Sequence, residues 1–192
     1  MPADQVPLAG VVGVVLAAGR SRRFGADKRW VPWQDEPLLA HVLRTARATC
    51  ERVLVVVERH DPLLDELLER LPAELLVCPD ARRGLPFSRR CGLDALQDDP
   101  VLRGVLIFLG DMPAIRPVDA RRLGAAMLEA GLPVRPTHGG APGHPVACPA
   151  RWLAELGESG FPGAVGRSIE WDHAGVVRDV DRPVDLANLT PP

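Results

Sequence analysis

Apolar runs alternate along the chain with segments in which every third or fourth residue is apolar. The runs are short and rich in valine and leucine, and they lie at residues 11–16, 53–57, 75–77 and 105–109. Such runs are typical of strands that are buried on both faces of a parallel sheet. Helical spacing follows at residues 38–46, 62–71, 88–97, 117–130 and 183–189. The alternation predicts right-handed crossovers, and therefore an α/β fold: a three-layer α/β/α sandwich around a mostly parallel sheet.

Turn-forming residues place the ends of several elements. Asp61 before Pro62 predicts the start of one helix, and Gly131 predicts the end of another. Residues 132–149 are rich in proline and glycine, which predicts a shaped loop or lid. A chain of 192 residues without a linker or a repeat fits one domain over residues 1–192.

Composition indicates the cellular compartment and excludes some classes of binding partner. The formal net charge is −2 and the isoelectric point about 6.2, so no overall field would attract a nucleic-acid backbone or an anionic membrane. The four cysteines are widely spaced and lack the pattern of a zinc site, which indicates reduced thiols. The apolar stretch at residues 8–18 follows Asp4 and precedes the arginines, an order that indicates a buried strand and not a leader peptide. We therefore expect a cytoplasmic protein that binds neither nucleic acid nor membrane.

A loop with small residues and cations follows the first predicted strand. Small residues let backbone N–H groups approach a ligand closely, and arginine and lysine add donors that suit phosphate oxygens. The loop is not a P-loop, because Lys28 does not follow a glycine and no serine or threonine follows it. A solvated arginine-rich turn is the simpler interpretation, but the coincidence of so many restrictive residues after a strand favours a site for a triphosphate.

This loop resembles the Leu-Ala-Ala-Gly-x-Ser-x-Arg-x-Gly-x-x-Lys signature of the MobA-like nucleotidyltransferases. The matching positions are Leu16, Ala17, Ala18, Gly19, Ser21, Arg23, Gly25 and Lys28. The resemblance implies a Rossmann-like nucleotidyltransferase fold in which the loop wraps the base and the triphosphate. It also implies that Arg23 and Lys28 neutralise the phosphates during catalysis.

An aspartate follows the fourth predicted strand, where the loops of a parallel sheet gather. Asp111 offers the hard oxygen ligands that Mg²⁺ prefers, although a turn aspartate can serve its own backbone instead. Gly-Asp-Met-Pro is also the metal motif of the family that the first loop resembles. The C-terminal residues 178–186 resemble that family's ending, which implies Asp179 as a second metal ligand. We expect Asp181 to cap the last helix and Asp185 to lie in its first turn.

Residues 84–93 resemble a nucleotide-binding segment of the cytidylyltransferase branch of the family. The resemblance implies that Ser88 contacts the base or the sugar and that Arg90 faces phosphate. The alternative for Ser88 is to cap the helix that follows it. Guanylyltransferases of the family tend to have other residues in both segments, so the resemblance implies CTP as the nucleotide.

The acceptor half matches the family less closely. Gly143-His144-Pro145-Val146 matches a family motif beside the acceptor pocket, so His144 either positions a substrate phosphate or is a structural donor in a turn. Many cytidylyltransferases of the family carry a carboxylate and an arginine where this chain has Phe161 and Val165. Two polar contacts to the acceptor are therefore missing.

Together the motifs predict a Mg²⁺-dependent transfer of CMP from CTP to a small phosphorylated acceptor, with release of pyrophosphate. The resemblance implies molybdopterin cofactor as the acceptor and a molybdoenzyme or its maturation factor as a protein partner. Two alternatives remain at this point. One is a guanylyltransferase or a sugar-phosphate nucleotidyltransferase, and the other is an NAD(P)-dependent oxidoreductase or nucleotide-binding protein that kept the fold and lost the transfer reaction.

Overall fold

The computed structural model describes residues 6–19, 21, 23–161, 163 and 166–189. The four apolar runs of the sequence form the parallel strands β1 (Leu8–Leu16), β4 (Cys50–Val57), β5 (Glu74–Val77) and β6 (Gly104–Leu109). β1 lies between β4 and β6, so that Gly13 is paired with Val53 on one side and with Leu106 on the other. The predicted parallel core of an α/β fold is therefore confirmed.

The proline- and glycine-rich residues 132–149 form strands, so the prediction of an irregular loop or lid is wrong. β7 (Val134–His138) and β8 (Ala141–Pro142) form a hairpin, and β9 (Val146–Pro149) pairs antiparallel with β6. Gly139 and Gly140 both have positive φ, 57° and 76°, which is the backbone that a two-residue hairpin turn needs. β10 (Arg167–Glu170) adds to β7 in parallel, which gives the order β10-β7-β9-β6-β1-β4-β5 with β8 beside β7.

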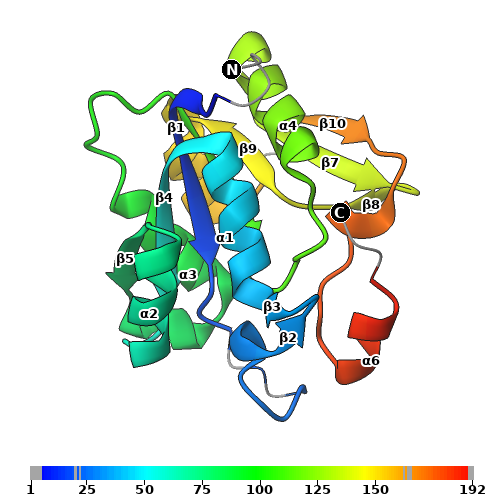
Figure 1. Ribbon diagram of the computed structural model, residues 1–192. Coiled ribbons are helices and arrows are strands. Elements are labelled where there is room, and N and C mark those ends of the chain that lie inside the picture. Colours follow the sequence, from blue (N-terminus) through cyan, green and yellow to red (C-terminus); the bar gives the residue numbers. More distant parts are fainter. Residues whose placement is uncertain (1–5, 20, 22, 162, 164–165, 190–192) are drawn as a thin grey trace.

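Two helical layers cover the sheet and complete the predicted sandwich (Figure 1). One layer holds α1 (Leu38–Thr49), α2 (Pro62–Arg70) and α4 (Pro117–Ala130), and the other holds α3 (Leu85–Asp94) and α5 (Leu153–Ser159). Successive residues of a strand point to opposite faces. In β1, Val11 and Val15 therefore pack with the first layer, whereas Val12 and Val14 pack with the second.

Most helix ends match their sequence signals. The Asp61 carboxylate accepts a hydrogen bond from the Leu63 backbone N–H at 3.1 Å, and Gly131 ends α4 with a left-handed φ of 62°. α3 begins three residues before its predicted start, because Gly84 adopts a φ of 122° and Pro86 fits the first turn. The short α6 (Pro183–Ala187) ends two residues before its predicted end.

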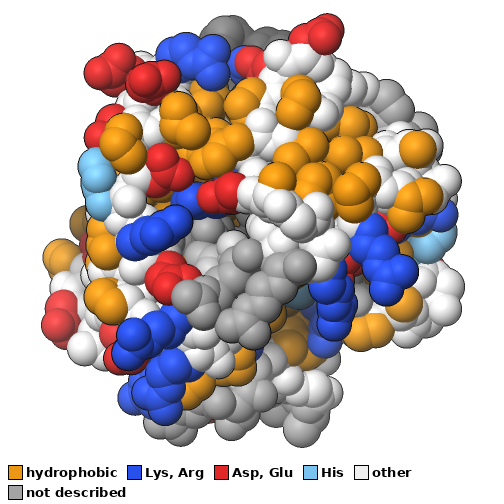
Figure 2. All heavy atoms as spheres, turned by 90° about the horizontal axis from the view of Figure 1, so that it is seen from below, with side chains coloured by type: hydrophobic (Ala, Val, Ile, Leu, Met, Phe, Trp, Pro, Cys, Tyr) orange, Lys and Arg blue, Asp and Glu red, His pale blue; other side chains and the backbone are white. Residues whose placement is uncertain are grey.

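Short elements gather at the end of the molecule where β1 ends. They comprise the 3₁₀ turns η2 (Lys28–Trp30), η3 (Pro79–Arg83) and η5 (Ala174–Val176), together with the hairpin of β2 (Pro32–Trp33) and β3 (Glu36–Pro37). A further 3₁₀ turn, η4 (Ala150–Trp152), lies at the opposite end of the sheet, since the Ala150 N–H donates to the carbonyl of Arg103, just before β6. β2, β3 and α6 lie below the carboxyl end of β1 in Figure 1. Figure 2 shows this end of the molecule, on which basic and acidic side chains are interspersed. Among the helices that the structure describes, none has the length and apolar character to span a membrane.

Candidate functional site

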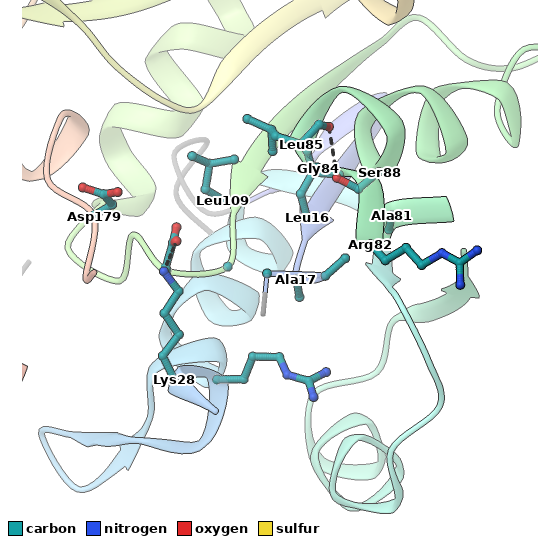
Figure 3. A pocket seen from close by; sticks show the side chains of 15 residues that line it. Leu16, Ala17, Lys28, Ala81, Arg82, Gly84, Leu85, Ser88, Leu109 and Asp179 are labelled. Atoms are coloured by element: carbon teal, nitrogen blue, oxygen red, sulfur yellow. Dashed lines mark hydrogen bonds and ion pairs between the residues drawn. The ribbon is translucent and has the colours of Figure 1, made fainter. Parts of the chain in front are cut away.

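A cavity of about 320 Å³ lies at the carboxyl ends of the parallel strands. The residues around it come from the loops after β1, β5 and β6, from α3 and from the segment before α6 (Figure 3). They are Leu16, Ala17, Ala18, Gly19, Lys28, Arg29, Ala81, Arg82, Gly84, Leu85, Ser88, Leu109, Gly110, Asp111 and Asp179. Ligands of parallel sheets bind at this edge, because the loops that follow the strands converge there.

The loop after β1 folds back on itself and returns Lys28 to the cavity. Ser21 has a positive φ of 48°, and its Oγ accepts a hydrogen bond from the Lys28 backbone N–H at 3.1 Å. Gly25 has a φ of 83°, and its N–H donates to the Ser21 carbonyl at 3.2 Å. Ser21 and Gly25 are not among the residues that line the cavity, whereas residues 16–19 are. Ser21 and Gly25 therefore shape the loop, and residues 16–19 line the cavity.

Lys28 lies in the middle of a set of oxygen atoms. Its Nζ is 2.6 Å from Oδ2 of Asp111, 2.9 Å from the carbonyl oxygen of Val180 and 3.4 Å from Oδ1 of Asp181. Its side chain is only 11% exposed. Burial alone would lower the pKa of Lys28, but the two carboxylates outweigh burial and raise the pKa above its ordinary value. The ammonium group is therefore charged at neutral pH.

Three carboxylates meet beside this ammonium group. Oxygen atoms of Asp111, Asp179 and Asp181 lie within 4.8 Å of one another. Asp179 and Asp181 flank the fully buried Val180, whose N–H donates to the Asp111 carbonyl at 3.0 Å. Burial and the charge of Asp111 raise the pKa of Asp179. Oδ1 of Asp111 is buried and has no hydrogen-bond partner within the described residues.

The role predicted for Asp181 is wrong, and the role predicted for Asp185 is confirmed. The Asp181 side chain joins the carboxylate cluster, and Oδ2 of Asp185 accepts hydrogen bonds from the backbone N–H groups of Asp181 at 2.9 Å and Arg182 at 2.6 Å. α6 begins at Pro183, so Arg182 and not Asp181 occupies the capping position. The sequence did carry a signal that Asp181 belongs to the cluster: Asp179 and Asp181 lie on either side of the apolar Val180.

Arg23 lies at the outer side of this cluster. Its Nη1 is 2.7 Å from Oδ2 of Asp181, and its side chain is 74% exposed. Burial would raise the pKa of Asp181, but Lys28 and Arg23 outweigh burial and lower it. Arg23 therefore contacts the cluster through Asp181 and does not line the cavity.

The structure separates the two residues that were predicted on α3. Ser88 lines the cavity and is 3% exposed, and its Oγ donates to the Leu85 carbonyl at 3.0 Å. Because α3 begins at Leu85, the alternative of Ser88 as a helix cap is wrong. Arg90 points elsewhere: its Nε is 3.5 Å from Oδ2 of Asp94, and it lines a separate hollow between α3 and α5.

Sequence reasoning missed Arg29 and Arg82, which add positive charge to the cavity wall. The Arg29 guanidinium is 2.5 Å from a carboxylate oxygen of Asp27 and 3.0 Å from one of Asp61, and its side chain is 11% exposed. Asp61 thus caps α2 and also fixes Arg29. No motif marks Arg29, because its partners lie two and 32 residues away in the chain.

His144 lies in the acceptor half and is not among the residues that line the cavity. Its backbone N–H donates to the Val176 carbonyl at 2.8 Å, and a Cβ on Gly143 would approach that same oxygen to 2.2 Å. Glycine is therefore required there for the chain to pass. Burial, with contributions from Arg135 and Arg89, lowers the pKa of His144 to about 4, so its ring is neutral at neutral pH.

Proteins of similar sequence point to one family. The sequence profile of the MobA-like NTP transferase domain matches residues 13–170. Molybdenum cofactor cytidylyltransferase of Escherichia coli K12 is 25% identical over 182 residues, which are 90% of this chain and 92% of that protein. A probable molybdenum cofactor guanylyltransferase of Chloroflexus aggregans is 33% identical over 108 residues, which are 55% of this chain and 48% of that protein.

Solved structures show the same fold. The crystal structure of Rv0371c from Mycobacterium tuberculosis H37Rv superimposes with a TM-score of 0.76 at 25% identity, covering 96% of this chain and 98% of that one. Rv0371c in complex with manganese superimposes with a TM-score of 0.74 at 23% identity, covering 93% of this chain and 97% of that one. Because the domain profile spans most of the sequence and the fold agrees, the chain belongs to the MobA-like NTP transferases, a family of nucleotidyltransferases.

Proposed function

We propose that this protein transfers CMP from CTP to a small phosphorylated acceptor, the molybdopterin cofactor, and releases pyrophosphate in a Mg²⁺-dependent reaction. The observation that carries the proposal is the meeting of Lys28 with three carboxylates, two of which, Asp111 and Asp179, line the cavity together with the loop after β1. Nucleotidyl transfer needs this combination, because the reacting phosphates are anionic and must be both neutralised and aligned.

The carboxylate cluster fits a divalent metal ion. Asp111, Asp179 and Asp181 supply only hard oxygen ligands, which suit Mg²⁺ and Mn²⁺ and disfavour softer metals. Oδ1 of Asp111 is buried and accepts no hydrogen bond from any described residue, which is costly for a carboxylate oxygen unless a cation reaches it. A bound Mg²⁺ would neutralise phosphate oxygens as a Lewis acid. The related fold of Rv0371c has been solved in complex with manganese.

The residues of this chain would bind and orient the nucleotide. Residues 17–19 line the cavity with little side-chain bulk, and Lys28 and Arg29 lie beside it to balance the triphosphate charge. An oxygen of the acceptor phosphate attacks the α-phosphorus of CTP. A new P–O bond forms as the bond to the β-phosphate breaks, and pyrophosphate leaves. No general base is needed because the attacking phosphate is already anionic.

CTP is the proposed nucleotide for two reasons. The Ala17-Ala18 turn and the segment with Gly84 and Ser88 both line the cavity, and both resemble the corresponding segments of cytidylyltransferases. In addition, the most extensive match to a curated protein reported above is to a cytidylyltransferase. The similarity to a guanylyltransferase makes GTP the second candidate.

Pyrophosphate release tests the proposal. Purified protein is incubated with Mg²⁺, one of the four NTPs and molybdopterin cofactor, and pyrophosphate is measured by an enzyme-coupled assay. We expect pyrophosphate release when CTP, acceptor and Mg²⁺ are all present. We expect no release when either Mg²⁺ or the acceptor is left out. Faster release with GTP would replace the cytidylyl proposal by the guanylyl one, and sugar phosphates offered in parallel test the other acceptor class. NTP binding without release for any acceptor would identify a binding protein or an oxidoreductase on this fold.

A further inference from the structure

Two partly buried arginines, Arg89 on α3 and Arg135 on β7, have no carboxylate partner among the residues that the structure describes. Nε of Arg89 and Nε of Arg135 are buried, and neither has a hydrogen-bond partner in the part of the chain that the structure describes. Among the described residues no carboxylate forms an ion pair with either guanidinium, whereas Arg29, Arg52 and Arg116 each have an oxygen of an aspartate within 2.5 Å. A partly buried cation without a counter-ion is unfavourable, so the presence of two such arginines needs an explanation.

The two guanidinium groups come together around one short segment. Nη1 of Arg89 lies 3.6 Å from the position of a Cβ on Gly160, and Nη2 donates to the carbonyl of Gly157 at 3.4 Å. Cζ of Arg135 lies 4.9 Å from the centre of the Phe161 ring. Both cations also act on the His144 ring and help to keep it neutral. α3, β7 and the segment after α5 thus present two cations and a neutral imidazole to one region.

This region adjoins the nucleotide cavity through α3. Ser88 lines the cavity, and Arg89 follows it about 100° further around the helix, toward α5. We propose that Arg89 and Arg135 form an anion subsite that holds the acceptor by its phosphate monoester group. The inference rests on the proposed transfer reaction, and it gives an acceptor-binding role to two residues for which the resemblance implied none.

The chemistry of the two groups selects a phosphate. Guanidinium presents planar N–H donors that match phosphate oxygens, and two cations match the double negative charge of a phosphate monoester. Phe161 contributes an aromatic face to Arg135 and no competing charge. A carboxylate at position 161 would neutralise Arg135 and displace the ligand.

Inorganic phosphate is the probe, and the His144 ring signals in an NMR spectrum are the reporter. The titration uses Lys28→Met protein, so that phosphate does not bind beside the glycine loop. We expect saturable shifts of the His144 signals, assigned with His144→Gln, and binding about tenfold or more weaker in Arg89→Gln and Arg135→Gln. Arg90→Gln is the matched control on α3, and it should bind phosphate as before. Acetate, with a single charge, should bind much more weakly than phosphate, and equal binding of acetate would contradict the phosphate assignment.

A second variant, Phe161→Asp, keeps both arginines. It tests the subsite even if the proteins without Arg89 or Arg135 do not fold. We expect about tenfold weaker phosphate binding in Phe161→Asp and little change in Phe161→Leu. In protein that keeps Lys28, both substitutions should leave CTP affinity unchanged. Phosphate binding that is equal in all these variants would overturn the subsite. Phosphate binding that follows the expected pattern, in a protein that releases no pyrophosphate with any acceptor, would keep the subsite and refute the transfer reaction instead.

Discussion

Lys28 is the central cation of the candidate site. It is the only lysine in the sequence, and it contacts two of the three clustered carboxylates. Its ammonium group balances part of their charge in the free protein and stands ready to meet the phosphates of a nucleotide. Arginine could not make the same compact contact, because its charge is spread over a planar fork.

Lys28→Ala should weaken NTP binding and turnover. A charge-assisted contact of this kind contributes about 1.5–3 kcal/mol, which corresponds to about tenfold to a hundredfold in affinity. Isothermal titration calorimetry with CTP and Mg²⁺ measures the change. Unchanged affinity and turnover would remove Lys28 from the site.

The same variant should bind Mn²⁺ more tightly when no nucleotide is present. Loss of the ammonium group 2.6 Å from Asp111 removes a cation that competes with the metal for the same carboxylates. Lys28→Arg is the control: its contact with the carboxylates is less compact, but it keeps the positive charge there, so its Mn²⁺ affinity should stay closer to that of the parent than the affinity of Lys28→Ala does. Weaker Mn²⁺ binding in Lys28→Ala would show that the metal does not bind to this cluster.

Asp111→Asn should lower metal-dependent turnover by about a hundredfold or more, the size expected when a charge stabiliser is lost. The fold should persist, because the change is nearly isosteric. Asp181→Asn should also weaken Mn²⁺ binding, since the structure places Asp181 in the cluster. Asp172→Asn is the control: this aspartate is 88% exposed and lies 3.6 Å from Arg116, outside the cluster. A wild-type Mg²⁺ dependence in Asp111→Asn would place the metal elsewhere.

At the scale of elements, α3 distributes three consecutive side chains to three environments. Ser88 faces the nucleotide cavity, Arg89 faces α5, and Arg90 forms an ion pair with Asp94 in a separate hollow. The helix can do this because it lies close to the sheet. A Cβ on Gly92 would come within 2.9 Å of methyl groups on Val14 of β1 and Val56 of β4.

Gly92→Ala should therefore push α3 away from the sheet. Overpacking of this kind costs about 1–3 kcal/mol, and the gain in helix propensity offsets about 1 kcal/mol of it. We expect lower stability in urea unfolding and weaker CTP binding, because Ser88 moves with the helix. Gly157→Ala in α5 is the control: its Cβ would lie 3.9 Å from Leu93, an ordinary contact, so stability should stay equal or rise. Equal stability of the two variants would show that the close packing of α3 has no energetic role.

At the scale of the whole molecule, the sequence predicted what local patterns control and missed what distant contacts control. β1 and β6 follow from their apolar runs, and α4 has the predicted bounds because Pro117 and Gly131 mark its ends. The hairpin in residues 132–149 was missed because Gly139-Gly140 lies among many other turn formers. Asp181 was assigned to a cap because its partners, Arg23 and Lys28, lie more than 150 residues earlier in the chain. Phe161 is described and stacks on Arg135, whereas Val165 lies outside the described residues, so the prediction of two missing acceptor contacts stays a prediction for Val165.

Nucleotide choice can be measured on the whole molecule as thermal stabilisation. A ligand that binds only the folded chain adds about 2.7 kcal/mol when its concentration is one hundred times its Kd, and for a chain of this size that raises Tm by about 5–10 °C. With Mg²⁺ present we expect the largest rise with CTP, because Ala17, Ala18 and Ser88 line a cavity of about 320 Å³ in which a purine would need more room. Chelation of the metal should abolish most of the rise, since triphosphate and carboxylates would then face each other without a bridging cation. Asp111→Asn is the matched control and should show little stabilisation by CTP and Mg²⁺. A larger rise with GTP or ATP than with CTP would reject the cytidylyl proposal and leave the family assignment intact.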